Sequence, residues 1–312
     1  MMGSMNKKMI VVYCLILLVF VVGCTPKQPE NPQDVAAVTR FVRSGSLGLD
    51  MRFVQNFPPN QIYDTTNLPV LLELRNLGTF DLAGNKCFIQ LSGFDQSIIR
   101  GMNVRQLCGE LPGKSVYSLE GGFGTIDFNS GNMILPADVD MYKPNIVATV
   151  CYEYQTIASP QVCVDPQFYD LVATQKACQV RDFGVSGGQG APVAVTYVNV
   201  DMMSNKAVFA IDIANVGGGR VVSPRAGIDR CPVGLKYDEF DQVRFRVELS
   251  GGRLVQCSPK DFMVRLVNNK GKIVCTFDIG NTQAFETPLR VELDYNYVQT
   301  VSKTVEIVRT PG

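Results

Sequence analysis

Short segments in which hydrophobic and polar residues alternate, rich in β-branched side chains, recur through most of the chain. Good examples are 70–74, 87–91, 208–213, 243–249 and 289–295. Alternation with a period of two is typical of strands that bury one face of a sheet. Clusters of Gly, Pro and Asn separate the segments, as turns do in a β-sandwich. The pattern therefore predicts an all-β protein built from antiparallel sheets.

The N-terminal segment has a different pattern. Lys7 and Lys8 precede an uninterrupted apolar run at 9–23. The run is 15 residues long, shorter than the ~20 residues that a membrane-spanning helix needs. A positive start followed by a short apolar run is typical of a signal peptide. We therefore expect residues 1–23 to direct the chain out of the cytoplasm.

The apolar run ends in Val21-Val22-Gly23-Cys24. This ending resembles the signal of prokaryotic lipoproteins, in which a small residue precedes the cysteine that receives lipid. Cys24 is therefore the candidate lipid-attachment residue, and a retained N-terminal anchor helix is the alternative. Residues 24–44 begin with Pro, Gln, Asn and Lys in a composition that cannot build a core, so we expect a semi-rigid tether there.

Eight cysteines follow the tether, and their even number beyond a signal peptide predicts a disulfide framework. They are Cys87, Cys108, Cys151, Cys163, Cys178, Cys231, Cys257 and Cys275. No two of them have the C-x-x-C spacing of zinc ribbons or thioredoxins. The alternative is that they are free, buried thiols.

The pairing of these cysteines follows from the predicted strands. Cys151 and Cys163 bracket two strand-like segments that meet near Pro160, so a hairpin would place the two cysteines side by side. We expect a Cys257–Cys275 bond because both residues lie in neighbouring strand-like segments. Elimination then pairs Cys87 with Cys108 and Cys178 with Cys231.

Three short motifs recur in the same order in both halves of the chain, which indicates a tandem duplication. The matches are 72–78 with 211–217, 89–93 with 247–251, and 151–156 with 294–300. In the first match a strand runs into Asn-x-Gly. There the Asn can bond local backbone, and we expect the Gly to adopt a positive φ.

The duplication divides the chain into two domains of common size. The predicted sandwiches occupy 45–165 and 191–312, and 166–190 forms a linker. Asp165 and Pro166 predict a short helix at the start of this linker. The glycine-rich run 187–190 lacks the Lys-Ser/Thr of a phosphate-binding loop, so it is interpreted as part of the linker.

A strand that ends in Asn-x-Gly, repeated in a prokaryotic surface lipoprotein, resembles the CARDB-like family of immunoglobulin-like modules. Asn76 with Gly78, and Asn215 with Gly217, carry the resemblance. The resemblance implies two tandem immunoglobulin-like β-sandwiches in an envelope protein of archaeal origin. It also implies a surface or adhesion-type role, with no catalytic residues.

The amino-acid composition excludes several classes of active site and of ligand. The chain has no His, which removes Ser-His-Asp triads, Cys-His pairs and H-E-x-x-H zinc sites. Its 29 basic and 29 acidic residues lack the basic excess of nucleic-acid-binding proteins. Acidic clusters at 138–140 and 238–241 could bind Ca²⁺, but neither has EF-hand spacing, so we expect solvated loops. We predict no cofactor, no metal and no enzymatic activity.

Two tyrosine pairs alternate with other residues, so each pair shares one face of a strand. They are Tyr152 with Tyr154, and Tyr295 with Tyr297. Tyrosine is frequent at interfaces, but such a pair more often packs a sheet face while its hydroxyls reach the rim. We expect packing.

These features predict a non-enzymatic, lipid-anchored protein on the outer face of the cytoplasmic membrane, acting as a structural or adhesion module. Its partners would be the membrane, through the lipid or the helix, and other envelope proteins or cell-surface polymers. The alternative is a subunit of a surface filament or envelope complex that assembles through edge strands, for which 301–310 offers a strand.

Overall fold

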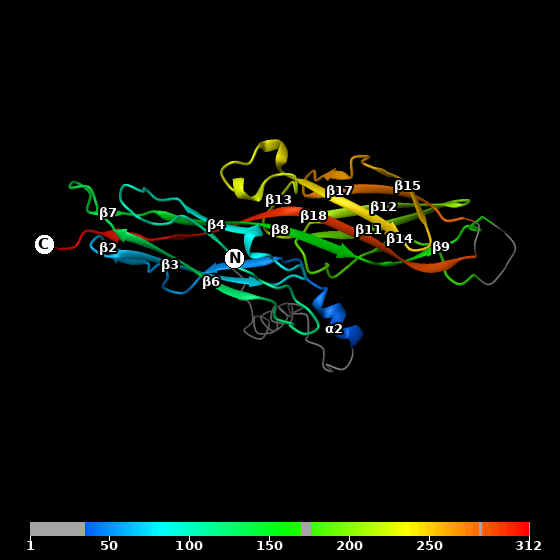
Figure 1. The fold of residues 1–312 in the computed structure, drawn as a ribbon, viewed down its shortest axis with the longest axis horizontal. Helices are drawn as coiled ribbons and strands as arrows, with labels where there is room; N and C mark the ends of the chain where they lie inside the picture. Colours follow the sequence, from blue (N-terminus) through cyan, green and yellow to red (C-terminus); the bar gives the residue numbers. More distant parts are fainter. Residues whose placement is uncertain (1–34, 170–175, 281–282, 312) are drawn as a thin grey trace, which may run out of the picture. The chain divides into compact units, whose positions relative to one another are not determined.

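The computed structural model describes residues 35–169, 176–280 and 283–311, and over these residues the protein is mostly β (Figure 1). The chain divides into two units, 1–41 and 42–312, each of which is considered by itself. The described part of the longer unit contains several antiparallel sheets and four disulfides. The expected all-β class is confirmed at this level.

Helix α2 (Val35–Val42) contains all the described residues of the shorter unit. It occupies part of the stretch 24–44 in which a tether was expected. Arg40 lies in its last turn, where a positive charge is favourable for a helix. Within the described residues, no helix is both long enough and apolar enough to cross a membrane. The expected signal segment 1–23 and Cys24 lie outside the described residues.

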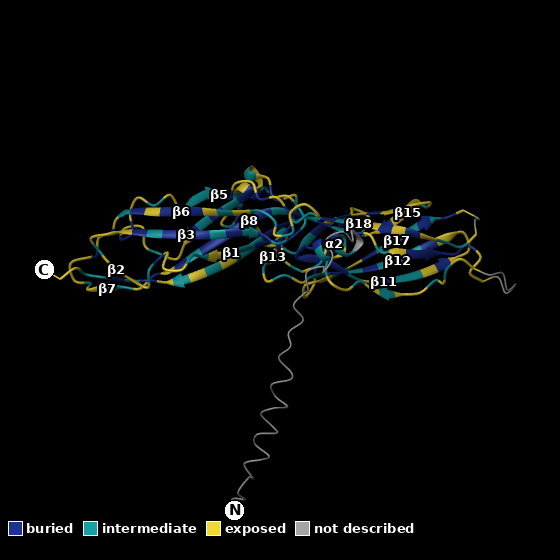
Figure 2. Ribbon diagram, turned by 90° about the horizontal axis from the view of Figure 1, so that it is seen from below, coloured by how far each residue is buried: buried dark blue, intermediate teal, exposed yellow. Residues whose placement is uncertain are grey.

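The first repeat forms two groups of strands that share a core. One is a sheet in the order β1-β3-β6, made of β1 (Leu49–Phe53), β3 (Asn67–Asn76) and β6 (Phe123–Asn132). The other contains β4 (Cys87–Ser92), β5 (Arg105–Leu107) and β8 (Asn145–Ala158), with the short helix η2 (Gly84–Lys86) before β4. Buried residues alternate with partly buried ones along most of β3 and with exposed ones in the middle of β6 (Figure 2), as the sequence pattern predicted. The buried residues of both groups belong to one hydrophobic cluster.

The second repeat has the same arrangement with more strands. Its first sheet has the order β10-β11-β12-β17-β15, made of β10 (Phe183–Gly184), β11 (Val193–Met203), β12 (Lys206–Asn215), β17 (Lys270–Asp278) and β15 (Arg253–Ser258). Its second group contains β14 (Gln242–Leu249), β16 (Met263–Arg265) and β18 (Phe285–Thr304), with β13 (Arg220–Val222) beside β18. Strands β11, β12, β14 and β18 thus correspond to β1, β3, β4 and β8.

The two repeats are joined by one continuous sheet, in the order β16-β14-β18-β8-β4-β5. At its centre β8 and β18 run antiparallel, side by side (Figure 1). This pairing sets Tyr152 opposite Tyr297 and Tyr154 opposite Tyr295. Corresponding strands of the duplication therefore pair with each other about a local pseudo-twofold axis near the pair Glu153–Asn296.

The central ribbon continues beyond β8 and β18 in both directions without a change of register. β9 (Gln161–Val164) pairs with the start of β18, and β19 (Glu306–Val308) pairs with β7 (Met141–Tyr142). β19 also pairs with β2 (Gln61–Tyr63) of the first repeat. The C-terminal segment 301–310, expected inside the second sandwich or as a donor strand, is therefore engaged with the first repeat.

The expected hairpin between residues 151 and 163 is wrong. β8 and β9 both pair with β18 in the same register, so Pro160 interrupts one straight strand instead of turning it. Proline lacks the N–H that a central strand needs but tolerates extended backbone. Its carbonyl still accepts a hydrogen bond from Leu289 N–H at 2.9 Å. Cys151 and Cys163 are thus about 40 Å apart at about 3.3 Å per residue, too far for a disulfide.

All eight predicted cysteines form disulfides, and the pairing partly differs from expectation. Cys87–Cys108 and Cys257–Cys275 are the predicted pairs. The other two bonds join Cys151 to Cys231 and Cys163 to Cys178, which corrects Cys151–Cys163 and Cys178–Cys231. The straightness of β8–β9 explains both corrections, because it separates Cys151 from Cys163 and leaves each free for another segment.

The end of the expected linker is built into the fold. Gly45 N–H donates to Gly187 O at 2.7 Å, and Gly190 N–H donates to Gly45 O at 3.0 Å. The buried Gln189 side chain bonds both backbone groups of Val195. At the start of the linker, Asp165 Oδ1 accepts the Gln167 N–H in a turn, and the rest of the expected helix falls largely at 170–175, outside the described residues.

The four central tyrosines fill the core, as expected, but their hydroxyls do not reach the rim. Tyr154 Oη donates to Asn76 Oδ1 at 3.3 Å, and the corresponding Tyr297 Oη donates to Asn215 Oδ1 at 2.9 Å. The hydroxyls of the other two tyrosines each accept a backbone N–H at 3.2 Å, from Leu49 and from Val193. Corresponding residues make corresponding bonds, which supports the duplication.

The Asn-x-Gly glycines serve a different purpose from the expected one. Neither Gly78 nor Gly217 has a positive φ. A Cβ at Gly78 would instead lie 1.8 Å from Tyr154 Oη, and a Cβ at Gly217 would lie 2.5 Å from Tyr297 Oη. Glycine is therefore required because the tyrosine hydroxyl must approach the Asn side chain past the backbone.

Burial raises the pKa of Tyr152, Tyr154, Tyr295 and Tyr297 above the usual range, because an ionised phenol is poorly solvated in the core. Because the pKa is higher in the folded than in the unfolded protein, the unfolded protein loses these protons first as the pH rises past the usual tyrosine pKa of about 10. These groups therefore lower the stability of the fold only above that pH. We expect Tyr152, Tyr154 and Tyr295, whose pKa burial raises most, to stay protonated in the native protein at about pH 11, where exposed tyrosines ionise. Tyrosinate absorbance after a pH jump, with and without denaturant, measures this. Identical native and denatured titrations would contradict it.

Candidate interaction surface

Residues 223–241 connect β13 to β14, and we call this segment the insertion loop. It forms most of the connection between β12 and β14 (216–241), and the corresponding connection between β3 and β4 in the first repeat (77–86) is much shorter. The insertion loop contains two short helices, η3 (Ile228–Arg230) and η4 (Tyr237–Glu239). It is therefore a feature that the second repeat has and the first lacks.

The insertion loop is fastened to the outer face of the shared sheet. Cys231 is bonded to Cys151 of β8, with Cα atoms 6.1 Å apart. Around the bond, Ile228 and Leu235 of the loop belong to a small apolar cluster with side chains from three strands. The strand members are Phe88, Cys151 and Val298. One disulfide thus ties the loop of one repeat to a strand of the other.

Polar contacts fix the first half of the loop to the strands of the shared sheet. Asn296 of β18 is buried, and its Nδ2 donates to the carbonyls of Ser223 and Ala226, both at 3.0 Å. The Arg105 guanidinium of β5 donates to Asp229 O. The Arg105 side chain also lies over the Phe88 ring, 4.7 Å from its centroid. The loop is held by both repeats.

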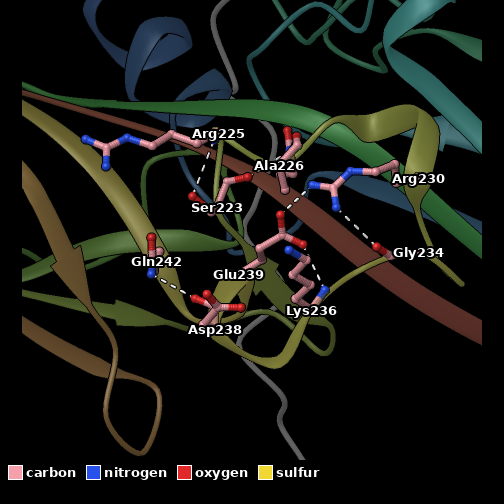
Figure 3. A network of polar contacts seen from close by, with 10 residues as sticks. Ser223, Arg225, Ala226, Arg230, Gly234, Lys236, Asp238, Glu239 and Gln242 are labelled. Atoms are coloured by element: carbon pink, nitrogen blue, oxygen red, sulfur yellow. Dashed lines mark hydrogen bonds and ion pairs between the residues drawn. The ribbon is translucent and has the colours of Figure 1, made fainter.

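A further network braces the loop internally (Figure 3). The Arg230 guanidinium forms an ion pair with Glu239 and donates to Gly234 O at 3.2 Å. The Lys236 N–H donates to Glu239 Oε2 at 2.8 Å. The hydrogen bond from Arg230 is the main reason that the pKa of Glu239 lies below its usual range. Asp238 contributes only its carbonyl, which accepts from the Gln242 side chain at 2.8 Å.

Three carboxylates of the acidic clusters considered for calcium form ion pairs with arginines. In the loop, Glu239 binds Arg230, and Asp241 lies 3.5 Å from the Arg220 guanidinium. Near the other cluster, Asp140 lies 3.3 Å from Arg309. Over the described residues, no three acidic or cysteine side chains gather in a way that could hold a metal ion.

The braced loop displays two apolar side chains to solvent. Tyr237 is 87% exposed and Val233 is 80% exposed. Large exposed apolar residues on a loop that is fixed in place are typical of binding surfaces, because little conformational freedom is lost on binding. Sequence reasoning missed this surface. The sequence feature that could have indicated it is Cys231, which lies in a long polar connection and has no counterpart in the first repeat.

The edge of the five-stranded sheet offers a second exposed surface. β15 is the last strand in its order, and Leu254 and Val255 on it are 38% and 50% exposed. Edge strands present unpaired backbone groups to other chains. By contrast, the C-terminal segment considered for assembly is paired, through β19, with β2 and β7.

Comparison with known proteins identifies no family. No protein-family model and no curated protein matches the chain. Among solved structures, it is weakly similar to the secreted serine protease VesC from Vibrio cholerae (11% identity, TM-score 0.20, covering 82% of this chain and 51% of the protease). The chain thus spans about half the length of that protease.

Two adhesins are also weakly similar to this chain. They are the CupB6 tip adhesin from Pseudomonas aeruginosa (10% identity, TM-score 0.18, covering 85% and 99% of the two chains) and the collagen adhesin CNA from S. aureus (9%, 0.12, covering 86% and 94%). Scores this low do not show a shared fold.

Proposed function

We propose that this chain is a non-enzymatic protein of the cell envelope that acts as a structural or adhesion module, anchored by lipid at Cys24. The insertion loop carries the proposal. It is fixed by the Cys151–Cys231 bond and by Arg230–Glu239, yet it exposes Tyr237. A rigid scaffold that presents an exposed aromatic side chain suits recognition of another surface.

Location and architecture support the same proposal. Four disulfides are typical of proteins that fold in an oxidising compartment. The positive, apolar N-terminal segment before Cys24 suits export and lipidation. The paired groups of antiparallel strands in each repeat suit two modified immunoglobulin-like sandwiches of the CARDB-like kind, joined through β8 and β18. The absence of His from the chain suits a role in binding rather than in acid–base catalysis.

The test uses the full chain in its own host. We expect Cys24→Ser to release the protein from the membrane or to leave an unprocessed precursor. The released protein should bind envelope fractions from cells that lack the chain. Adding Tyr237→Ser and Val233→Ser should lower that binding about tenfold or more, because a central aromatic side chain at an interface contributes about 2 kcal/mol.

The matched control is Tyr117→Ser, because Tyr117 is 97% exposed and lies in a different loop. This variant should bind envelope fractions as strongly as the protein whose insertion loop is unaltered. Equal binding by the Tyr237/Val233 and Tyr117 variants would contradict the proposed binding surface. Normal processing and membrane retention of Cys24→Ser would contradict the lipid anchor.

Assembly through edge strands is the second candidate function, and β15 favours it. Leu254 and Val255 lie exposed at the end of a five-stranded sheet, where another chain could add a strand. Light scattering on the same released protein separates the candidates. A monomer at all concentrations contradicts assembly, whereas growth into oligomers favours it.

A further inference from the structure

A shallow pocket of about 250 Å³ lies on the outer face of the shared sheet, beside the insertion loop. We call it the polar pocket and define it by Glu153, Gln155, Arg244, Asp294 and Asn296. These residues come from three adjacent strands, β8, β18 and β14. Glu153 lies opposite Asn296, and Asp294 lies between Gln155 and Arg244 across the sheet.

One side chain of the pocket has an unmet hydrogen-bonding requirement. Asn296 is 2% exposed, and its Nδ2 is occupied by the two loop carbonyls. Its Oδ1, on the other side of the amide, is buried and accepts no hydrogen bond from the residues that the structure describes. A buried acceptor without a donor is costly and uncommon in folded proteins. The pocket therefore favours a ligand that brings a donor to Asn296.

The remaining groups of the pocket restrict what that ligand can be. Gln155 Nε2 donates to Asp294 Oδ1 at 2.7 Å, and Lys86 Nζ lies 2.8 Å from Glu153 Oε1. Arg244 is exposed, and within the described chain its guanidinium makes no hydrogen bond or ion pair.

The pocket thus presents acceptors together with a free donor. A bare cation would leave the Arg244 guanidinium without an acceptor, and both Arg244 and Lys86 would repel it. A bare anion would face two carboxylates and the Asn296 oxygen. A hydroxyl group both donates and accepts, and adjacent hydroxyls can do so on neighbouring partners. The chemistry therefore suits a neutral ligand with several hydroxyls.

The counterparts of these polar residues across the pseudo-twofold axis have a different chemistry. The pseudo-twofold axis makes Asp294 the counterpart of Cys151, and Gln155 the counterpart of Val298. Cys151 and Val298 lie in the apolar cluster beneath the insertion loop. On one side of the axis the insertion loop packs on these positions, and on the other side the same positions are polar, half-buried and part of the pocket wall. The two halves have diverged at the pocket.

We propose that the polar pocket binds a saccharide of the cell surface. One sugar hydroxyl donates to Asn296 Oδ1, and a neighbouring hydroxyl accepts from Arg244 while it donates to Asp294. The inference rests on the proposed adhesion function and names the class of molecule that the protein binds. It involves a different part of the surface from Tyr237, so the two can be tested apart.

The test is binding of the purified full chain to an array of neutral oligosaccharides, followed by calorimetric titration with the glycan that gives the strongest signal. Arg244→Ala should weaken binding about tenfold, as loss of a hydrogen bond to a charged group does. Arg246→Ala is the matched control, because Arg246 lies two residues along the same face of β14 and pairs instead with Glu292 at 3.2 Å. It should leave the affinity unchanged.

A second pair of variants gives an independent comparison. Asp294→Asn should weaken binding, and Glu292→Gln should not. Absence of binding to every glycan, or equal affinities of Arg244→Ala and Arg246→Ala, would overturn the saccharide proposal. If glycan binding fails while envelope binding still depends on Tyr237, the adhesion function stands without the saccharide. If glycan binding behaves as expected while envelope binding is independent of Tyr237, the pocket stands and the loop surface fails.

Discussion

Removal of the Cys151–Cys231 bond, in the double variant Cys151→Ala/Cys231→Ala, should lower the free energy of unfolding by about 4 kcal/mol. The two cysteines are 80 residues apart in sequence, and in the chain-entropy model a bond that closes so long a loop restricts the unfolded chain strongly. The bond also joins the insertion loop of one repeat to β8 of the other. Its loss should therefore loosen the loop as well as the fold. Denaturation under non-reducing conditions measures the first effect, and limited proteolysis within 223–241 measures the second.

The matched control is Cys163→Ala/Cys178→Ala, which opens a bond with a sequence separation of only 15. The same model gives about 3 kcal/mol for that bond. This variant should leave the insertion loop resistant to proteolysis, because Cys231 and its contacts are retained. Equal protease sensitivity of 223–241 in both double variants would show that the Cys151–Cys231 bond does not hold the loop.

Gly78→Ala should lower the free energy of unfolding by about 3 kcal/mol, at the upper end of what overpacking usually costs. The added Cβ would lie 1.8 Å from Tyr154 Oη and 2.4 Å from the carbonyl oxygen of Gly190. The tyrosine is buried in the core and the carbonyl belongs to the backbone, so neither can move aside easily. Gly217→Ala should have a similar effect, because its Cβ would lie 2.5 Å from Tyr297 Oη. Chemical denaturation gives both values.

Gly218→Ala provides the control beside Gly217. A Cβ at Gly218 would meet no atom within 4 Å, and its φ is not positive. We expect a change of no more than about 0.5 kcal/mol, as for an ordinary surface substitution. If Gly78→Ala and Gly218→Ala were equally stable, the close approach of Tyr154 could not be the reason for the glycine.

Features that depend only on the local sequence pattern were predicted well. Alternation along 70–74 or 243–249 depends only on which side chains face a core, so it identified strands β3 and β14. The duplicated motifs marked corresponding positions such as Asn76 and Asn215, whose side chains do bond corresponding tyrosines. The Cys257–Cys275 bond followed because both residues lie on neighbouring strands.

The candidate surfaces could not be predicted in this way. The insertion loop looked like a solvated acidic connection, because nothing in its own residues indicates that Cys231 meets Cys151. The polar pocket needs Gln155 and Asp294 to lie side by side, although 139 residues separate them in the sequence. Proximity of that kind depends on which strands pair, and local residue patterns do not specify it.

By itself, the sequence determined that this chain is a disulfide-bonded β protein and predicted two related halves, because alternation, cysteine number and repeated motifs are local properties. Tertiary structure alone decided how the halves combine. Pro160 could end a hairpin or interrupt a straight strand, and the choice depended on the long edge that β18 offers to both β8 and β9. That pairing separated Cys151 from Cys163, tied the insertion loop to the other repeat, and created the polar pocket at the pseudo-twofold axis.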